Sequence, residues 1–268
     1  PGRFFNCGVA EANMMSMAAG LAMNGLRPVV YTITPFVTTR CLEQIRVDVC
    51  YHHVPVVIVG VGGGLSYASL GATHHSCEDI AFLRALPNMQ VVCPGDAWET
   101  QAAFKAALGQ DEPVYLRLGK KGEPQVHASE PSFEIGRAIT IQDGSDTAIL
   151  STGNLLPTAV EAARLLAADD ISTRVVSFHT VKPLDEGCLA ETFERARVVA
   201  TLEEHSVLGG FGSAVCEWLA DQVKPRARLM RIGTADTFLH EAGDQAYARA
   251  RNKLTAPQIA QRIREAID

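Results

Sequence analysis

The stretch Pro55–Val61 has the sequence PVVIVGV, a short apolar run rich in β-branched residues. Runs of this kind, separated by longer segments with helical periodicity, are typical of buried strands in a parallel sheet with crossover helices. The other strands predicted in this half of the chain are Pro28–Ile33, Met89–Cys93 and Val114–Leu118. The predicted helices are Val9–Met23, Phe36–Tyr51, Ser76–Leu86 and Ala97–Leu108, the last two with Ser76 and Asp96 as N-caps.

The same alternation restarts after residues 119–132, which are rich in Gly, Pro, Lys and Glu and show no periodicity. The later predicted strands are Ala138–Ile141, Thr147–Ser151, Thr173–Ser177, Val198–Glu203 and Arg228–Ile232, and the helices are Leu156–Ala167, Gly210–Asp221 and Ala256–Ala266. We therefore predict an α/β protein of two domains, residues 1–120 and 135–268, joined by a linker at 121–134. Each domain is expected to be a mostly parallel sheet flanked by helices.

Composition narrows the class of protein. The chain has 268 residues, 47% of them hydrophobic, enough for a buried core in each domain. A formal charge of −6 argues against a nucleic-acid partner. The longest apolar run, near Val54–Val61, is too short to span a bilayer, so no membrane partner is expected. The seven cysteines are odd in number and form no C-x-x-C pair, which favours reduced thiols in the cytoplasm and no zinc site.

The start of the chain lacks an expected element. Residues 1–10 enter the first helix without a preceding strand, although a strand–helix–strand unit normally begins with one. We therefore expect a first strand, within a segment of about 30–45 residues, to be missing from this domain.

Two passages carry a family resemblance. Phe5–Met14 has the sequence FNCGVAEANM, and Gly71–His75 (GATHH) is followed by EDIA at 78–81 and by PNM at 87–89. Both resemble motifs of the pyrimidine-binding domain of transketolase-like enzymes. Looser matches follow in the family's order, namely EQIR at 43–46, PGD at 94–96 and LGGFG at 208–212. The resemblance covers essentially the whole chain, because the second half is similar to the transketolase C-terminal domain.

The resemblance implies an enzyme that uses thiamine diphosphate, which serves as an electron sink for carbon–carbon bond chemistry. By this resemblance, Glu11 is the carboxyl group that hydrogen-bonds the cofactor's pyrimidine ring. A dry, apolar wall around Glu11 would raise the pKa of its carboxyl group. The alternative is an ordinary acidic residue in a first helical turn, where the helix dipole favours it.

An aromatic or apolar floor for the pyrimidine ring is expected after the strand Pro28–Ile33, because open α/β sheets hold ligands at the carboxyl ends of their strands. Phe36 is the candidate, with ordinary core packing as its alternative. The family often has a second aromatic residue three positions earlier, where this chain has Ile33.

The histidine pair lies in a polar, glycine-bounded loop, a usual place for catalytic groups. By resemblance, His74 reaches the reacting oxygen of the substrate, and a histidine can donate or accept a proton near neutral pH. His75 is a second substrate-binding candidate. The alternative for both is a structural or merely exposed histidine.

The loop departs from true transketolases. Those enzymes usually carry an acidic pair where this chain has Ser69 and Leu70, and a histidine near Gly62. Loss of these polar groups removes contacts that select a hydroxylated donor. We therefore expect a smaller or less polar donor, such as a 2-oxo acid or a deoxy or otherwise modified sugar.

Basic residues follow the last strand of the first domain. By resemblance, a basic residue near Lys120 holds a substrate phosphate, with Arg117 as a further candidate; a solvated basic stretch is the alternative. The glycine run at 60–64 matches neither G-x-G-x-x-G nor a P-loop, so we do not expect it to bind phosphate.

No Gly-Asp-Gly segment is present, although the family holds Mg²⁺ and the diphosphate with one. We therefore predict no metal ligands in this chain, and a separate subunit that carries the diphosphate-binding domain and Mg²⁺. The second domain is expected to serve mainly assembly, with a homodimer contact inside an α2β2 heterotetramer. His205 and Gly209–Gly212 fit a subunit contact, a cation loop or a simple turn.

The first hypothesis is thus the C-terminal subunit of a split transketolase that transfers a two-carbon ketol unit from a ketose to an aldehyde. The alternatives are the beta subunit of a 2-oxo acid dehydrogenase, a 1-deoxyxylulose-phosphate-synthase-like enzyme, and a non-catalytic assembly module.

Overall fold

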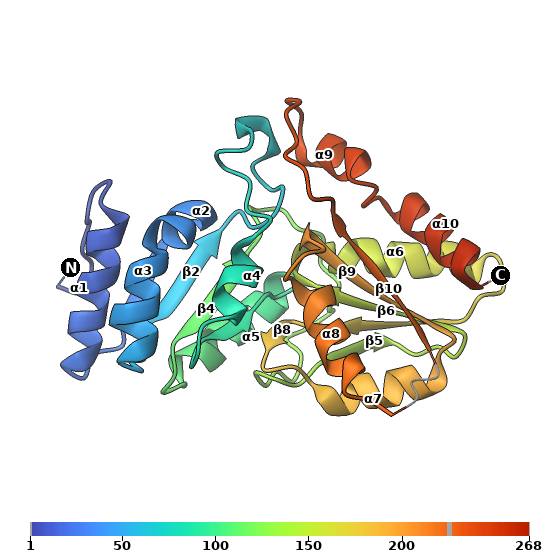
Figure 1. The fold of residues 1–268 in the computed structure, drawn as a ribbon, viewed down its shortest axis with the longest axis horizontal. Helices are drawn as coiled ribbons and strands as arrows, with labels where there is room; N and C mark the ends of the chain where they lie inside the picture. Colours follow the sequence, from blue (N-terminus) through green and yellow to red (C-terminus); the bar gives the residue numbers. More distant parts are fainter. Residues whose placement is uncertain (1, 224–226, 268) are drawn as a thin grey trace.

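The computed structural model describes residues 2–223 and 227–267, so the outermost residues of the two predicted domains, Pro1 and Asp268, lie outside it. The chain folds into two sheets side by side, the first at the left of Figure 1 and the second at the right. Both sheets are mostly parallel and are flanked by helices, as predicted.

The first sheet has the order β1-β2-β4-β3-β8. Its strands are β1 (Val29–Ile33), β2 (Val57–Val61), β3 (Gln90–Val92), β4 (Val114–Leu118) and β8 (Thr180–Lys182). The first four strands pair in parallel, whereas β8 comes from the second half of the chain and pairs antiparallel with β3. This strand was not predicted, and it joins the two halves through a shared sheet.

The second sheet has the order β10-β9-β6-β7-β5, with β5 antiparallel to its neighbour. Its strands are β5 (Ile139–Gln142), β6 (Thr147–Thr152), β7 (Thr173–Ser177), β9 (Val198–Ser206) and β10 (Arg228–Thr234). Successive residues of β6 face opposite sides of the sheet. Ile149 packs in one apolar cluster with α6 and α10, and Leu150 in another that includes residues of α7 and α8.

The helices cover both faces of each sheet. They are α1 (Glu11–Met23), α2 (Thr34–Val37), α3 (Leu42–Gln44), α4 (Asp79–Arg84), α5 (Ala97–Leu108), α6 (Leu156–Ala167), α7 (Glu186–Arg195), α8 (Phe211–Ala220), α9 (Gln245–Arg251) and α10 (Ala256–Ile267). Sequence periodicity did not predict α7 or α9. Each begins at an aspartate whose carboxylate accepts a backbone N–H, Asp185 for α7 and Asp244 for α9.

Two helix predictions were wrong in detail. The segment 36–51 is not one helix but two short α-helical turns, a 3₁₀ turn at Thr39–Cys41 and a π-helix at Ile45–Tyr51. The helix predicted from Ser76 begins at Asp79, because Ser76 instead exchanges both backbone hydrogen bonds with Gly64. Asp96 does cap α5, since its side chain accepts the N–H of Glu99.

A buried ion pair holds the junction between the halves. Arg117, at the end of β4, donates to the Asp79 carboxylate at 2.7 Å and to the carbonyl oxygens of Ser76 and Glu204. Burial disfavours the charge on Asp79, but the charge of Arg117 and the other favourable interactions of this carboxylate, among them hydrogen bonds from Arg117 and Tyr115, together outweigh it, so the pKa of Asp79 lies below its ordinary value. Removing one partner of such a pair typically costs about 3–5 kcal/mol.

Glu204, on β9, is the second buried charge at this junction. Its carboxylate accepts hydrogen bonds from the Leu65 N–H at 2.8 Å, from Asn154 and Gln245, and it pairs with Arg249 of α9. Glycine makes this approach possible, because a Cβ at Gly64 would lie 2.5 Å from the Glu204 carbonyl oxygen. The glycine run at 60–64 therefore lets the second domain approach the loop closely, and phosphate binding is not needed to explain these glycines.

The segment between the domains forms no helix or strand in residues 119–138 and is fastened to α5. Asp96 accepts the backbone N–H groups of Val126 and His127, and the His127 ring lies 2.9 Å from the Glu99 carboxylate. The hydrogen bond to Glu99 raises the pKa of His127 above its ordinary value.

We predict a pH-dependent contribution of His127 to stability. A histidine with a raised folded-state pKa stabilises the fold fully below its unfolded pKa of about 6.5, and loses this contribution as pH rises through the folded-state pKa. The stability difference between the wild type and His127→Asn, measured by urea unfolding, should therefore be largest near pH 6 and shrink by about pH 9. His53→Asn is the matched control, since His53 is exposed. A difference that stays constant with pH would contradict a charged His127.

Candidate active site

The loop that follows β2 places His74 next to Phe36. The His74 ring lies 5.3 Å from the Phe36 ring and 6.4 Å from the Tyr67 ring, edge-on in both cases. Its Nδ1 lies 3.0 Å from the Thr73 hydroxyl. Because Nδ1 is engaged, Nε2 is the nitrogen left to face a substrate.

Glu11 opens α1 and is almost fully buried, with 9% of its surface exposed. Its carboxylate accepts a hydrogen bond from Arg40 at 2.8 Å. This hydrogen bond outweighs desolvation, so the pKa of Glu11 is lowered. The expectation that an apolar wall would raise the pKa of Glu11 was wrong, because Arg40 donates a hydrogen bond to the carboxylate and adds a positive charge beside it.

Arg40 also covers Phe36, since its guanidinium carbon lies 4.4 Å from the centre of the ring. Phe36 is half-buried in α2, directly beyond the end of β1, and Ile33 is the half-buried last residue of that strand. The structure thus brings Glu11, Phe36 and His74 together through ring and charge contacts.

Lys120 extends the same series of contacts. Its ammonium nitrogen lies 5.0 Å from the centre of the Tyr67 ring, which in turn neighbours His74. A continuous path of side chains therefore runs from Glu11 through Arg40, Phe36, His74 and Tyr67 to Lys120.

Two predicted site residues lie elsewhere. Arg117 is 3% exposed and its guanidinium is engaged by Asp79 and two carbonyl oxygens, which accounts for it as a structural cation. His75 lines a small cavity shared with the second domain, and its Nε2 is buried with no partner among the described residues. The two neighbouring histidines thus have different surroundings.

The sequence did not indicate Arg40 or Tyr67 as neighbours of the candidate site. Arg40 lies four residues after Phe36, the spacing at which helical side chains meet, and this was the available signal. Tyr67 had none, because its position depends on the path of the loop. A Cβ at Gly62 would lie 2.0 Å from the Tyr67 ring, so Tyr67 fills the space in front of that glycine.

Comparison with known families agrees with this geometry. Residues 1–124 match the transketolase pyrimidine-binding domain, and residues 136–259 match the transketolase C-terminal domain. The chain belongs to the transketolase family.

Two relatives that match over most of their length are described as transketolase subunits. The chain is 37% identical to the 6-deoxy-6-sulfo-D-fructose transketolase subunit SqwH of Clostridium sp. (strain MSTE9), over 99% of this chain and 81% of that protein. It is 38% identical to one of the subunits of the apulose-4-phosphate transketolase of Phocaeicola vulgatus, over 84% of this chain and 72% of that protein. The chain is thus a C-terminal, transketolase-like subunit, as the first hypothesis held.

A solved structure described as a split-gene transketolase, an inactive β4 tetramer, is also similar. It superposes with a TM-score of 0.92 at 38% identity, covering 100% of this chain and 85% of the other. The two-domain arrangement is therefore that of a transketolase subunit.

We predict that Arg40 sets the ionisation of Glu11. Arg40→Gln should raise the Glu11 pKa, because the hydrogen bond and charge of Arg40 are what lower it. The measurement is an NMR titration of carboxyl-labelled glutamate, with the Glu11 signal assigned from Glu11→Gln. Arg46→Gln, the same charge change at an exposed residue of the π-helix, should leave the Glu11 pKa unchanged. A Glu11 pKa that is indifferent to Arg40 would refute this ion pair.

Proposed function

We propose that this chain supplies the pyrimidine half of a thiamine-diphosphate site, which a separate subunit carrying the diphosphate-binding domain completes. The enzyme transfers a two-carbon ketol unit from a ketose donor to an aldehyde acceptor. The observation that carries the proposal is the convergence of a buried carboxylate, an aromatic ring and a histidine, Glu11, Phe36 and His74.

Arg40 supports the fit of the cofactor ring. Its planar, cationic guanidinium donates to the Glu11 carboxylate and stacks on Phe36. A protonated aminopyrimidine ring needs the same two contacts, a carboxylate acceptor and an aromatic face. Arg40 therefore stands in for the ring, and it must leave this position when the cofactor binds. Ile33, at the end of β1, is the proposed apolar residue beside the ring.

The bound cofactor supplies the electron sink for the reaction. Glu11 holds the pyrimidine ring by hydrogen bonding to its ring nitrogen. His74, oriented by Thr73 and by the edge contact with Phe36, moves a proton at the substrate oxygen. Lys120 lies at the far end of the path of contacts, where it binds the phosphate or other anionic end of the substrate.

The donor is proposed to be a ketose that lacks a hydroxyl group recognised by most transketolases. Ser69 and Leu70 replace the acidic pair, and the Tyr67 ring fills the space in front of Gly62. Names of the relatives are consistent with this, since one acts on a sulfonated deoxy sugar and another on apulose 4-phosphate. A modified sugar is therefore favoured over a 2-oxo acid.

The partner subunit is proposed to hold Mg²⁺ and the diphosphate in an α2β2 assembly. Apolar residues stand exposed directly before Glu11, with exposed fractions of 80% for Phe4, 60% for Phe5 and 91% for Val9. Exposed apolar groups of this size mark an interface that another subunit covers.

We place the enzyme in the cytoplasm, supported by seven free cysteines. Among the described residues, no helix is long and apolar enough to cross a membrane.

We predict that turnover requires both the partner and Glu11. The chain mixed with thiamine diphosphate, Mg²⁺ and donor should be inactive, and addition of the diphosphate-domain subunit should restore ketol transfer. In the complex, Glu11→Gln should lower kcat at least about 10²-fold, the usual scale for a proton-handling group. Glu161→Gln, the same change at an exposed site on α6, should leave kcat unchanged. Turnover by the chain alone, or a fully active Glu11→Gln complex, would refute the proposal.

We predict that Leu70 contributes to donor choice. Leu70 is 51% exposed in the loop, so an aspartate is tolerated there. In the complex, Leu70→Asp should raise kcat/KM for a fully hydroxylated ketose phosphate relative to a deoxy analogue by about tenfold, the scale of one hydrogen bond to a charged group. An unchanged ratio of the two kcat/KM values would show that residue 70 does not contact the donor.

A further inference from the structure

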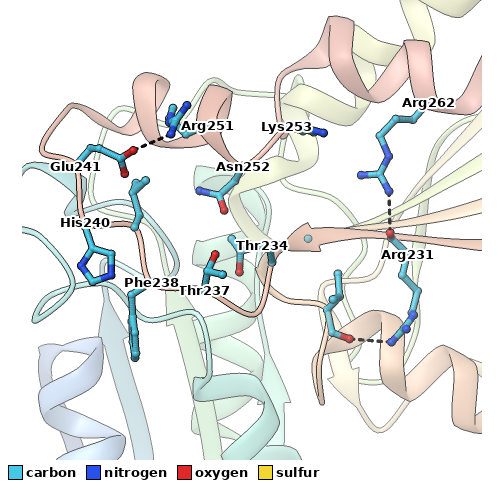
Figure 2. Close-up of a pocket in the computed structure, with 14 residues that line it drawn as sticks. Arg231, Thr234, Thr237, Phe238, His240, Glu241, Arg251, Asn252, Lys253 and Arg262 are labelled. Atoms are coloured by element: carbon cyan, nitrogen blue, oxygen red, sulfur yellow. Dashed lines mark hydrogen bonds and ion pairs between the residues drawn. The ribbon is translucent and has the colours of Figure 1, made fainter.

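A second cavity lies in the C-terminal domain, away from Glu11. It has a volume of about 850 Å³, within the range of small-molecule sites. Its walls are the end of β10, the loop that follows it, and the turn between α9 and α10 (Figure 2). Phe238, 68% exposed, and Leu239 provide an apolar side to this cavity.

The cavity is strongly cationic. Arg231, Arg251, Lys253 and Arg262 line it, against a single carboxylate, Glu241. Glu241 pairs with Arg251 at 2.7 Å, so one of the four cations is neutralised. In the described part of the chain, the other three form no ion pair, although the charge of Arg231 acts on the buried Glu203 carboxyl group and works to lower its pKa. This concentration of positive charge is opposite in sign to the net charge of the protein, −6.

Main-chain contacts hold two of these cations in place. Arg262 donates to the carbonyl oxygen of Arg231 at 3.3 Å, and Arg231 donates to the carbonyl oxygen of Val207 at 2.9 Å, as Figure 2 shows. Lys253 has a left-handed backbone, with φ of 59°, in the turn between α9 and α10. Such a conformation costs a side-chain-bearing residue free energy, so the surrounding turn must hold the Lys253 backbone in place.

Unpartnered polar atoms also point to a ligand. Thr234 is 4% exposed, and its hydroxyl has no hydrogen-bond partner in the described structure although it lines the cavity. A smaller adjoining cavity of about 160 Å³ shares Thr234 and Asn252 and reaches His75, whose Nε2 is likewise unpartnered. Buried polar atoms are nearly always hydrogen-bonded, so an unpartnered atom beside each of these adjoining cavities favours a polar occupant.

We propose that this cavity is a binding site for a small phosphate-bearing molecule. The phosphate is held by Lys253 and Arg262, because guanidinium and ammonium groups are the usual partners of phosphate. The organic part of the ligand packs against Phe238, and its polar groups bond Thr234. The ligand is separate from the donor bound at Lys120.

The test is a calorimetric titration of the chain without its partner, so that no thiamine-diphosphate site is complete. The probe is inorganic pyrophosphate at constant ionic strength, with citrate in a parallel series. We expect one saturable pyrophosphate site. Arg262→Gln and Lys253→Asn should each weaken binding at least about tenfold, since each removes a charge-assisted hydrogen bond. Glutamine suits the helix α10, and asparagine suits the left-handed turn, so both variants should fold, which circular dichroism verifies.

Two controls separate this site from others. Lys120→Gln removes the proposed substrate-phosphate residue, and Arg164→Gln removes a cation exposed on α6. Neither should change pyrophosphate affinity. The proposal is overturned by an absence of saturable binding, by affinity that ignores Arg262 and Lys253, by loss of binding in Lys120→Gln, or by a site that takes citrate but not pyrophosphate. Because turnover is not measured, failure here leaves the proposed ketol transfer untouched.

Discussion

The structure depends on keeping the buried charge of Arg117 paired. Its guanidinium is taken from water at the carboxyl end of β4, where Asp79 and two carbonyl oxygens compensate it. One of those carbonyls belongs to Ser76, in the loop that bears His74, and the other to Glu204, in the second domain. A single cation therefore fixes the first sheet, the loop that bears His74 and the second domain relative to one another. An uncompensated charge is so costly that these three parts are constrained to pack together.

This constraint explains why the loop after β2 can be irregular yet firmly placed. It contains few apolar residues, and by composition alone it would be mobile. Its two ends are instead fastened, Leu65 to the Glu204 carboxylate and Ser76 to Gly64 and Arg117. Between these points the loop places Tyr67 against His74, and His74 against Phe36. A rigid scaffold that positions a polar loop is the usual arrangement of catalytic sites.

The sequence predicted what depends on local pattern. The apolar runs predicted strands such as β2 and β4, and the aspartate before α5 predicted its start. The family motifs indicated Glu11 and His74 as site residues, and the strand that ends before Phe36 indicated Phe36; their shared role stays a prediction. Three structural features were not predicted from the sequence, because they depend on residues far apart in the chain. Strand β8 is stabilised by pairing with β3, Ser76 is drawn from a helix cap to Gly64, and Arg117 is turned inward by Asp79. The direction of the Glu11 pKa shift was not predicted for the same reason, since no local sequence pattern places Arg40 against Glu11.

The two adjacent histidines face different domains of the molecule. His74 faces Phe36 in the first domain, whereas His75 lines the cavity bounded by Thr234 and Phe238 in the second. In Figure 1 the loop that bears them rises beside the loop that leads into α9. The two residues are consecutive in the chain, so a ligand that contacts His75 acts directly next to His74. A ligand of the second domain would alter ketol transfer only if it bound more tightly to one arrangement of this loop than to another. The loop is held at Leu65 and Ser76, so few such arrangements are open to it. The contacts that position His74 therefore also limit how strongly a ligand of the second domain can affect His74.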